Sequence, residues 1–331
     1  MILQFFLLYI SGGNKDYVVT ITGALEEEKA HLIAWIEERR NQNTKDSYST
    51  YSKQYLEYTT LRGFDPKSDI SLASFMRASL ERGLSRSTIN SSIVAAAADM
   101  YRYDDIPMGR GPLITQLKKV VSESTPTPSQ KKPIEMAHIR RMAVLVKPCF
   151  VHVRDFFMIL LMTVCMMRES EAVSLLATDV TLDMIEGAWS LVVKVQKSKT
   201  DQVRAGHTIL VAPSPLRLTC PLYWYTVYDR LRLEGSPYFF HQVPGVHRSG
   251  LEKLSSNTPC HIVKNRLAEL GIDSSGYGSH SCRRGGATAA VAAKVDLHLV
   301  KRHGNWKSDA VYLYIVDSAE AQMSVSEAIL A

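Results

Sequence analysis

Four short stretches, far apart in the sequence, carry residue types that are suited to binding an anion such as a phosphate or to acting on it. The first, residues 167–171, contains Arg168 and Glu171 and ends a long apolar run. An arginine buried there needs a carboxylate partner or an anion. Glu171 follows Arg168 by three residues, on the same side of a helix, and is suited to orient the guanidinium. A purely structural arginine–glutamate pair has the same pattern, so this stretch alone leaves both interpretations open.

The second stretch joins two β-branched runs, 190–196 and 207–211, whose pattern is typical of a β-hairpin. It carries Lys197, Lys199 and Arg204. An ammonium group at the tip of a hairpin can reach a phosphate in a neighbouring cleft. Lysines on edge strands also serve only to prevent aggregation, so this signal is weak alone.

The third stretch begins a predicted helix. His280 and Arg283 are three residues apart, so both side chains project from one face of its first turn. The free backbone N–H groups at a helix start already favour an anion. Gly285 and Gly286 follow, and each costs about 1 kcal/mol relative to alanine inside a helix. Their presence predicts close packing of this helix against a neighbour.

The fourth stretch, residues 303–316, contains Trp306 and two tyrosines. Ser308 is suited to cap a short helix that carries Tyr312 and Tyr314. Positions two apart differ by about 200° around a helix, so only one of the tyrosines can face a shared site. An aromatic helix that merely packs on the core would carry the same residues.

The composition of the chain limits the classes of protein to which it can belong. It has 331 residues, 46% apolar and 22% charged, which is ordinary for a globular protein and excludes collagen-like, coiled-coil and disordered classes. No apolar run reaches the ~20 residues that span a bilayer, and residues 1–10 lack the basic region and cleavage site of a secretory signal. The five cysteines form no CxxC pair, and the histidines have no metal-ligand spacing. We therefore expect free thiols, no metal and no cofactor.

The positive charge of the chain lies in its second part. Residues 1–130 carry 15 basic and 15 acidic side chains, which leaves 24 basic and 18 acidic side chains in residues 131–331 and accounts for the net +6. Clusters of basic residues in a domain with surplus positive charge suggest a polyanion partner. A solvated surface of mixed charge explains the same count, and the charge alone leaves both open.

The chain divides at a proline-rich segment, residues 122–133, because three prolines among Ser, Thr and Lys favour an extended connection. Residues 1–23 have no defined pattern. Residues 24–121 form a helical bundle, with helices predicted at 24–40, 46–63, 72–82 and 87–103. Residues 134–331 combine the hairpin with helices predicted at 135–146, 155–167, 258–270, 280–294, 297–302 and 309–316. The predicted fold class is multidomain, α followed by α+β.

Taken in order, the four stretches resemble the tyrosine recombinase (site-specific integrase) family. Its pattern runs arginine, hairpin lysine, His-x-x-Arg, His or Trp, and then tyrosine. The matching residues are Arg168, Lys199, His280, Arg283, Trp306 and Tyr314. The sequence around the tyrosine resembles most the integrases of DIRS-type retrotransposons and cryptons, and the resemblance covers residues 24–320. In many bacterial members the tyrosine lies nine positions after the tryptophan, whereas Tyr314 lies eight positions after Trp306. Tyr312 therefore stays a second candidate.

The resemblance implies an enzyme that breaks and rejoins DNA without metal or ATP. The two arginines would hold the nonbridging phosphate oxygens, and His280 would add a hydrogen bond. Tyr314 would attack the phosphorus and form a 3′-phosphotyrosyl bond, while Lys199 protonates the leaving 5′ oxygen. Trp306 would pack on the tyrosine and offer its indole N–H to the phosphate. The first part of the chain would be the family's helical core-binding domain, and the second part its mostly helical catalytic domain with a small antiparallel sheet.

The resemblance also implies the partners. Double-stranded DNA would be held between the two domains, and four protomers would assemble on paired sites, each passing a C-terminal segment such as residues 317–331 to a neighbour. Off DNA the chain would be a monomer or weak dimer, nuclear or cytoplasmic. The candidate DNA contacts outside the catalytic set are Lys131, Lys132, Lys197, Arg204 and Arg284. Two alternatives remain: a domesticated DNA-binding protein that has lost activity, and a type IB topoisomerase-like enzyme.

Overall fold

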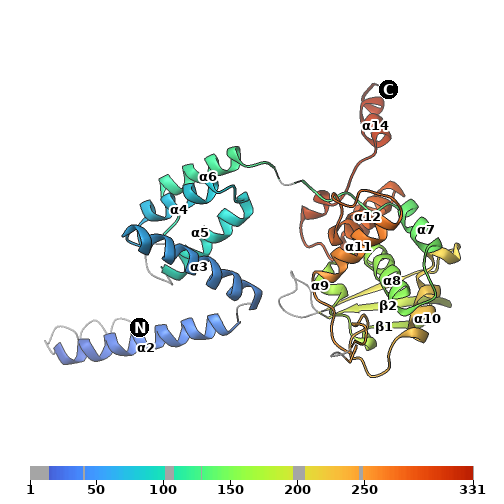
Figure 1. Cartoon of the computed structure of the whole chain (residues 1–331), viewed down its shortest axis with the longest axis horizontal. Helices are drawn as coiled ribbons and strands as arrows, with labels where there is room; N and C mark the ends of the chain where they lie inside the picture. The colour runs from blue at the N-terminus through green and yellow to red at the C-terminus, as the bar shows by residue number, and fades with distance from the viewer. Residues whose placement is uncertain are drawn as a thin grey trace, which may run out of the picture. The chain divides into compact units, whose positions relative to one another are not determined.

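The computed structural model describes residues 15–39, 42–100, 108–127, 129–196, 206–245 and 249–330. These residues form two compact units, divided after residue 128, which we call the N-terminal unit and the C-terminal unit. Most of their helices and strands are labelled in Figure 1. None of the described helices is long and apolar enough to cross a membrane.

The described part of the N-terminal unit is built from helices. They are α2 (Lys15–Arg39), α3 (Gln42–Arg62), α4 (Asp69–Glu81), α5 (Arg86–Met100) and α6 (Pro112–Ser124). Apolar side chains of α3 to α6, among them Tyr55, Met76, Ile93 and Ile114, form one buried core. Ser68 caps α4 by accepting a hydrogen bond from the N–H of Ile70.

Two helices of this unit differ from the sequence prediction. Residues 1–23 were expected to lack structure, but α2 already begins at Lys15. Its first turns include the β-branched run 18–22, whose low helix propensity hides the helix from a sequence pattern. The second, α6, was not predicted. It begins with Pro112 at a position that tolerates proline, and it extends to Ser124, into the segment expected to be a linker.

The C-terminal unit consists of helices packed on a three-stranded antiparallel sheet in the order β1-β2-β3. The strands are β1 (Val180–Ile185), β2 (Ala188–Val195) and β3 (His207–Val211). The hairpin predicted from the sequence corresponds to β2 and β3, which pair from Leu191↔Val211 to Val195↔His207. The first strand was not predicted, because only Val180 of its six residues is buried and the period-2 alternation is weak. Residues 197–205, which join β2 to β3, lie outside the described residues.

The helices of the C-terminal unit surround α8 (Phe150–Val164), which is buried from Val153 to Thr163. The others of at least seven residues are α7 (Met136–Val144), α10 (Pro221–Leu231), α11 (Thr258–Glu269), α12 (Ser279–Ala292), α13 (Leu297–His303) and α14 (Ala319–Leu330). The short helices are α9 (Glu169–Ala172), η1 (Ala177–Asp179), η2 (Arg217–Thr219) and η3 (Asp309–Leu313). The five cysteines are unpaired, as expected.

The two glycines of α12 allow the close packing that the sequence predicted. A Cβ on Gly286 would overlap the carbonyl oxygen of Thr163 at the end of α8, and a Cβ on Gly285 would overlap that of Ile134. The prediction of close packing is therefore confirmed. The approach fixes the start of α12 relative to α8 and to the chain that enters the C-terminal unit.

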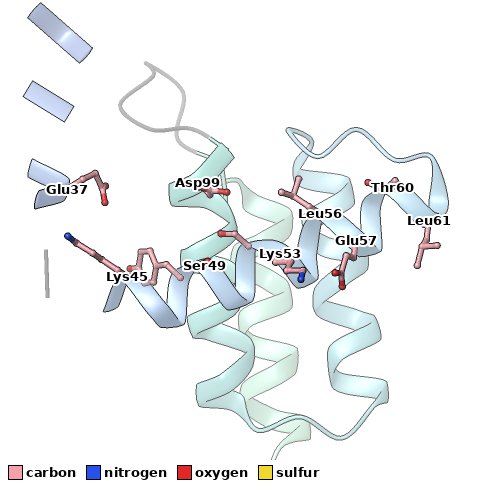
Figure 2. A pocket seen from close by; sticks show the side chains of 11 residues that line it. Glu37, Lys45, Ser49, Lys53, Leu56, Glu57, Thr60, Leu61 and Asp99 are labelled. Carbon is pink, nitrogen blue, oxygen red and sulfur yellow. The ribbon is translucent and has the colours of Figure 1, made fainter. Parts of the chain in front are cut away.

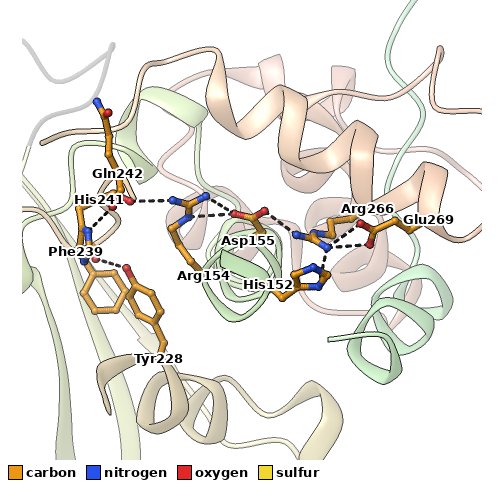
Figure 3. Close-up of polar contacts among 9 residues, drawn as sticks. All are labelled: His152, Arg154, Asp155, Tyr228, Phe239, His241, Gln242, Arg266 and Glu269. Atoms are coloured by element: carbon orange, nitrogen blue, oxygen red, sulfur yellow. Dashed lines mark hydrogen bonds and ion pairs between the residues drawn. The ribbon is translucent and has the colours of Figure 1, made fainter. Parts of the chain in front are cut away.

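A buried ionic network joins α8 to α11 (Figure 3). The carboxylate of Asp155 accepts hydrogen bonds from Arg154, at 2.8 Å, and from Arg266, at 2.9 Å. Arg266 also donates to Glu269 at 2.9 Å and to Nδ1 of His152 at 3.0 Å. Each of these charges therefore has a partner, which offsets the cost of burying it. The network holds together α8 and α11, against which α12 packs.

Candidate active site

Arg283 lies at the centre of the candidate site. Its side chain is 1% exposed and projects from the first turns of α12. One terminal nitrogen donates to the carbonyl of Met166, and the other donates to that of Gly304 at 2.8 Å. The guanidinium also lies 3.8 Å from the centroid of the Trp306 ring, a cation–π contact. Two loops far apart in the sequence are thus joined through one side chain.

The charge of Arg283 is only partly compensated. Burial, followed by the nearby positive charge of Arg168, lowers the pKa of Arg283 to about 10, and the opposing effect of Glu171 is smaller. The guanidinium therefore stays protonated at neutral pH. Its Nε is buried and, among the described residues, has no hydrogen-bond partner. An anion placed at this nitrogen would gain a charge-assisted hydrogen bond.

Arg168 and Glu171 form the pair that their spacing predicted, but at a different place in the fold. Helix α8 ends at Val164, and Arg168 is the N-cap residue of the four-residue helix α9. The Glu171 carboxylate accepts from the backbone N–H of Arg168 at 2.8 Å and from its Nη1 at 2.7 Å. Arg168 is partly exposed and Glu171 is 6% exposed. One buried carboxylate thus fixes both the backbone and the guanidinium of Arg168.

Trp306 covers Arg283 from the side of Gly304. The indole is 7% exposed, and its N–H is buried without a partner among the described residues. A Cβ on residue 304 would occupy the same space as the six-membered ring of Trp306. Glycine at this position is therefore what lets the indole lie flat beside the guanidinium. Together with Nε of Arg283, the indole N–H makes a second buried donor in the same cluster.

Tyr314 follows η3 and lies against this cluster. Its ring centroid is 5.3 Å from that of Trp306 and 6.4 Å from that of His280, and the Arg283 guanidinium lies 5.3 Å from it. Tyr312, by contrast, is 60% exposed. Ser308 accepts from the N–H of Ala310 and caps the segment, as predicted, although the helix is a short 3-10 helix.

His280 is exposed at the second residue of α12. The preceding residue, Ser279, donates a hydrogen bond to the carboxylate of Glu169, which follows Arg168. This bond ties the start of α12 to the start of α9 and so links the segments of the two arginines. Sequence reasoning missed it, because the two residues are 110 positions apart and neither belongs to the motif.

Arg284, which the sequence suggested as a DNA contact, is buried and has partners inside the fold. It is 8% exposed, and its Nη1 donates to the side-chain oxygen of Gln130 and, at 2.8 Å, to the carbonyl of Leu313. Burial lowers the pKa of Arg284, and Tyr314 opposes that effect. These partners hold the guanidinium inside the fold, and a contact of Arg284 with DNA stays a prediction.

The other predicted DNA contacts fall into two groups. Lys131 and Lys132 are exposed, and the Lys131 ammonium donates to the carbonyl of Ser275 at 3.3 Å. Lys197, Lys199 and Arg204 lie outside the described residues. The structure therefore brings together Arg168, Glu171, His280, Arg283, Trp306 and Tyr314, and it does not describe the hairpin lysine that would complete the set.

Each unit also has a groove. In the N-terminal unit an open groove of about 820 Å³ lies along α3 (Figure 2), and its lining mixes Lys45 and Lys53 with Glu57. In the C-terminal unit a mostly apolar groove of about 690 Å³ lies between α12, α13 and β3. Across the described ranges, no group of three or more His, Cys, Asp or Glu residues could hold a metal ion.

Comparison with known proteins identifies the fold of this chain. No protein-family model and no curated protein sequence matches the chain. Solved structures do match. The Tn1549 transposon integrase in complex with transposon right end DNA aligns over 90% of this chain and 98% of its own, with a TM-score of 0.59 and 13% identity.

Two further structures agree. The XerH site-specific recombinase bound to palindromic difH substrate covers 79% of this chain and 71% of its own, with a TM-score of 0.54 and 16% identity. A lambda integrase dimer bound to a COC′ core site covers 96% and 85%, with a TM-score of 0.54 and 15% identity. The chain therefore has the tyrosine recombinase fold. The fold class and the resemblance predicted from the sequence are confirmed at this level.

Proposed function

We propose that this chain is a site-specific DNA recombinase or integrase that cleaves and rejoins strands through a covalent 3′-phosphotyrosyl intermediate. The observation that carries the proposal is the contact of Tyr314 with Arg283 and Trp306, beside two buried donors that have no acceptor among the described residues. A phosphate that reached these donors beside the tyrosine would satisfy both. The fold, shared with structures solved on recombination-site and transposon-end DNA, supports the same conclusion.

In the first step the phenolic oxygen of Tyr314 attacks the phosphorus, and the bond from phosphorus to the 5′ oxygen breaks. The negative charge that grows on the nonbridging oxygens is stabilised by Arg168 and Arg283, which are already charged and already held by Glu171 and by backbone carbonyls. Such preorganisation lowers the barrier, because the donors need not reorient when charge develops.

Two proton transfers complete this step. A phenol keeps its proton at neutral pH, so Tyr314 needs a base, and we assign that role to exposed His280, whose ring is 6.4 Å from the tyrosine ring. The leaving 5′ oxygen needs a proton, which we assign to Lys199 on the β2–β3 connection. The 5′-hydroxyl of a second strand then attacks the phosphotyrosyl bond, restoring the phosphodiester and the free tyrosine. No metal or ATP enters these steps.

The proposed partners are double-stranded DNA and further copies of the chain. We assign Lys131 and Lys132 to the DNA backbone because both are exposed beside the start of α12. For assembly into a tetramer we propose that α14 of one protomer enters the apolar groove of a neighbour. All twelve residues of α14 are exposed, including Val325, Ile329 and Leu330. An enzyme of this kind acts wherever it has access to DNA, in the nucleus or the cytoplasm.

The test compares wild type with two matched variants, Tyr314→Phe and Tyr312→Phe. Each protein is incubated with fragmented DNA in EDTA and quenched with detergent, and the covalently attached DNA is sequenced. We expect adducts at one defined site from wild type and Tyr312→Phe, and none from Tyr314→Phe. Adducts that survive in Tyr314→Phe and disappear in Tyr312→Phe would move the nucleophile to Tyr312.

The adducts, read together with DNA binding, relaxation of supercoiled DNA and joining of two sites, separate the alternatives. If wild type binds DNA but forms no adduct, the inactive DNA-binding protein is correct and the recombinase proposal fails. If adducts form and supercoiled DNA is relaxed, but two sites are never joined, the topoisomerase-like enzyme is correct.

A further inference from the structure

Arg284 is hydrogen-bonded to two segments that lie far apart in the sequence. One of its nitrogens, Nη1, donates both to the side chain of Gln130 and to the carbonyl of Leu313, at 2.8 Å for the latter. Gln130 lies two residues after the division between the units, and Leu313 immediately precedes Tyr314. A single buried guanidinium therefore contacts both the chain that arrives from the N-terminal unit and the segment that carries the proposed nucleophile.

The arriving chain, residues 129–134, is fixed at its far end; we call it the linker strap. The N–H of Lys132 donates to the carbonyl of Gly276 at 2.9 Å, and that of Ile134 donates to the carbonyl of Ser281 at 2.9 Å. The Ile134 carbonyl also lies against Gly285. Gln130, at the other end of the strap, is exposed. A displacement of the strap would therefore first disrupt the hydrogen bond between Gln130 and Arg284.

Residues 313–316, which we call the tyrosine segment, are hydrogen-bonded to the same face of α12. Thr288 lies four residues after Arg284, on the same side of the helix. Its hydroxyl donates to the carbonyl of Tyr314 at 3.3 Å and accepts from the N–H of Val316 at 3.1 Å. The carbonyls of Leu313 and Tyr314 are thus held by two side chains of α12, of which only Arg284 also touches the strap.

We propose that Arg284 is a positioning residue that couples the linker strap to Tyr314. With Gln130 in place, the guanidinium is held against the Leu313 carbonyl, and Tyr314 stays beside Arg283 and Trp306. When the strap moves, Arg284 loses an acceptor, and its hold on the tyrosine segment weakens. The inference rests on the proposed function, because it assumes that Tyr314 is the nucleophile. It would make strand cleavage depend on the state of the connection to the N-terminal unit.

The first test needs no DNA and no activity. Amide hydrogen exchange of the full chain is compared for wild type, Gln130→Ala, Gln130→Glu and the neighbouring Ser129→Ala. Losing one charge-assisted hydrogen bond should speed exchange at Tyr314 and Val316 about tenfold in Gln130→Ala. Gln130→Glu keeps an acceptor oxygen and should exchange like wild type, as should Ser129→Ala. Exchange in α11 should be the same in all four proteins.

The second test measures the rate of adduct formation on saturating DNA that carries the site found by sequencing. We expect Gln130→Ala and Arg284→Lys each to slow that rate about tenfold with unchanged DNA affinity, and Gln130→Glu to keep it. Because both variants break one connection, the double variant should be no slower than the slower single variant. An effect on DNA affinity instead of rate would mean that Arg284 and Gln130 serve DNA binding, which contradicts the inference.

The outcomes separate the inference from the function on which it rests. If wild type forms adducts and Gln130→Ala changes neither the exchange at Tyr314 nor the rate, the coupling is refuted and the recombinase proposal stands. If wild type forms no adduct, the recombinase proposal fails. The exchange at Tyr314 then still decides whether Arg284 transmits a change in the strap, and unchanged exchange refutes that as well.

Discussion

At the scale of single residues, the candidate site depends on burying a positive charge. Arg283 is among the largest fully buried side chains of the described residues. Two backbone carbonyls and the face of Trp306 compensate the guanidinium, and its Nε is left for an acceptor from outside. Burying a charge is costly unless it is paired, and the incomplete pairing is the feature on which the proposed phosphate site rests.

The indole N–H of Trp306 can be tested apart from its ring. Trp306→Phe keeps an aromatic face on Arg283 but removes the donor, and loss of one donor to a developing anion should slow adduct formation about 100-fold. Trp306→His keeps a ring N–H, so its rate of adduct formation should fall much less. Rates are measured on saturating DNA, and circular dichroism checks that both variants fold. Equal rates in Trp306→Phe and wild type would contradict a role for the indole N–H.

The sequence predicted the residues of the cluster better than their surroundings. His280, Arg283, Trp306 and Tyr314 could be selected because each belongs to a spaced motif with known phosphate chemistry. The role of Arg284 could not, because its partners lie 154 and 29 residues away and carry no motif of their own. A short motif indicates which residues can do chemistry. The hydrogen-bond partners of a buried side chain depend on tertiary packing, which a motif does not contain.

At the scale of secondary structure elements, the site is assembled where α12 approaches the end of α8. Helices such as α4 and α11 were predicted within a few residues of their ends. Strand β1 was missed because only Val180 of its residues is buried, which leaves little alternation to detect. Helix α6 was missed because it begins at a proline and runs into the segment whose prolines predicted a linker. The contact of α12 with α8 was predictable only through its two glycines.

The close approach of α12 to α8 makes Gly286 intolerant of any side chain. Gly286→Ala gains about 1 kcal/mol of helix propensity, but its methyl group must displace the Thr163 carbonyl. We expect a net loss of about 2 kcal/mol in the free energy of unfolding, because overpacking forces the backbone apart. Denaturant unfolding measures it, with Gly245→Ala, where nothing lies within 4 Å, as the control. If the variant were as stable as wild type, α12 could move away from α8 without loss of stability, which would contradict the prediction.

At the scale of the whole molecule, the described residues form two units with separate cores. The N-terminal unit buries the residues around Tyr55 and Met76, and the C-terminal unit buries those around α8. The sequence predicted a linker at residues 122–133 from its prolines, and the two units divide after residue 128. We expect two unfolding transitions, each responding to changes in its own unit.

Acidification should destabilise the C-terminal unit through His152. Burial, followed by the charge of Arg266, lowers the pKa of His152 below the ordinary value of about 6.5. Below about pH 6.5 the unfolded chain therefore binds a proton that the folded unit resists, and the free energy of unfolding falls as the pH drops. Above that pH the histidine is neutral in both states and the effect vanishes.

His152→Gln keeps an acceptor for Arg266 but cannot take up a proton. Between pH 7 and pH 5 the melting temperature of the C-terminal unit should therefore fall less in this variant than in wild type. Calorimetry resolves the two transitions, and the N-terminal unit, whose single histidine is the exposed His31, serves as the internal reference. Parallel curves for the two proteins would rule out His152 as the source of the acid sensitivity.

The overlap between residue 304 and the indole of Trp306 also constrains how this protein can evolve. Any side chain at position 304 collides with the six-membered ring of Trp306, and a histidine at position 306 has no such ring. Substitutions at the two positions must therefore occur in a fixed order, with the tryptophan replaced first. In a lineage that keeps Trp306, selection removes every change at Gly304, so a side chain at position 304 should occur only where position 306 is no longer tryptophan.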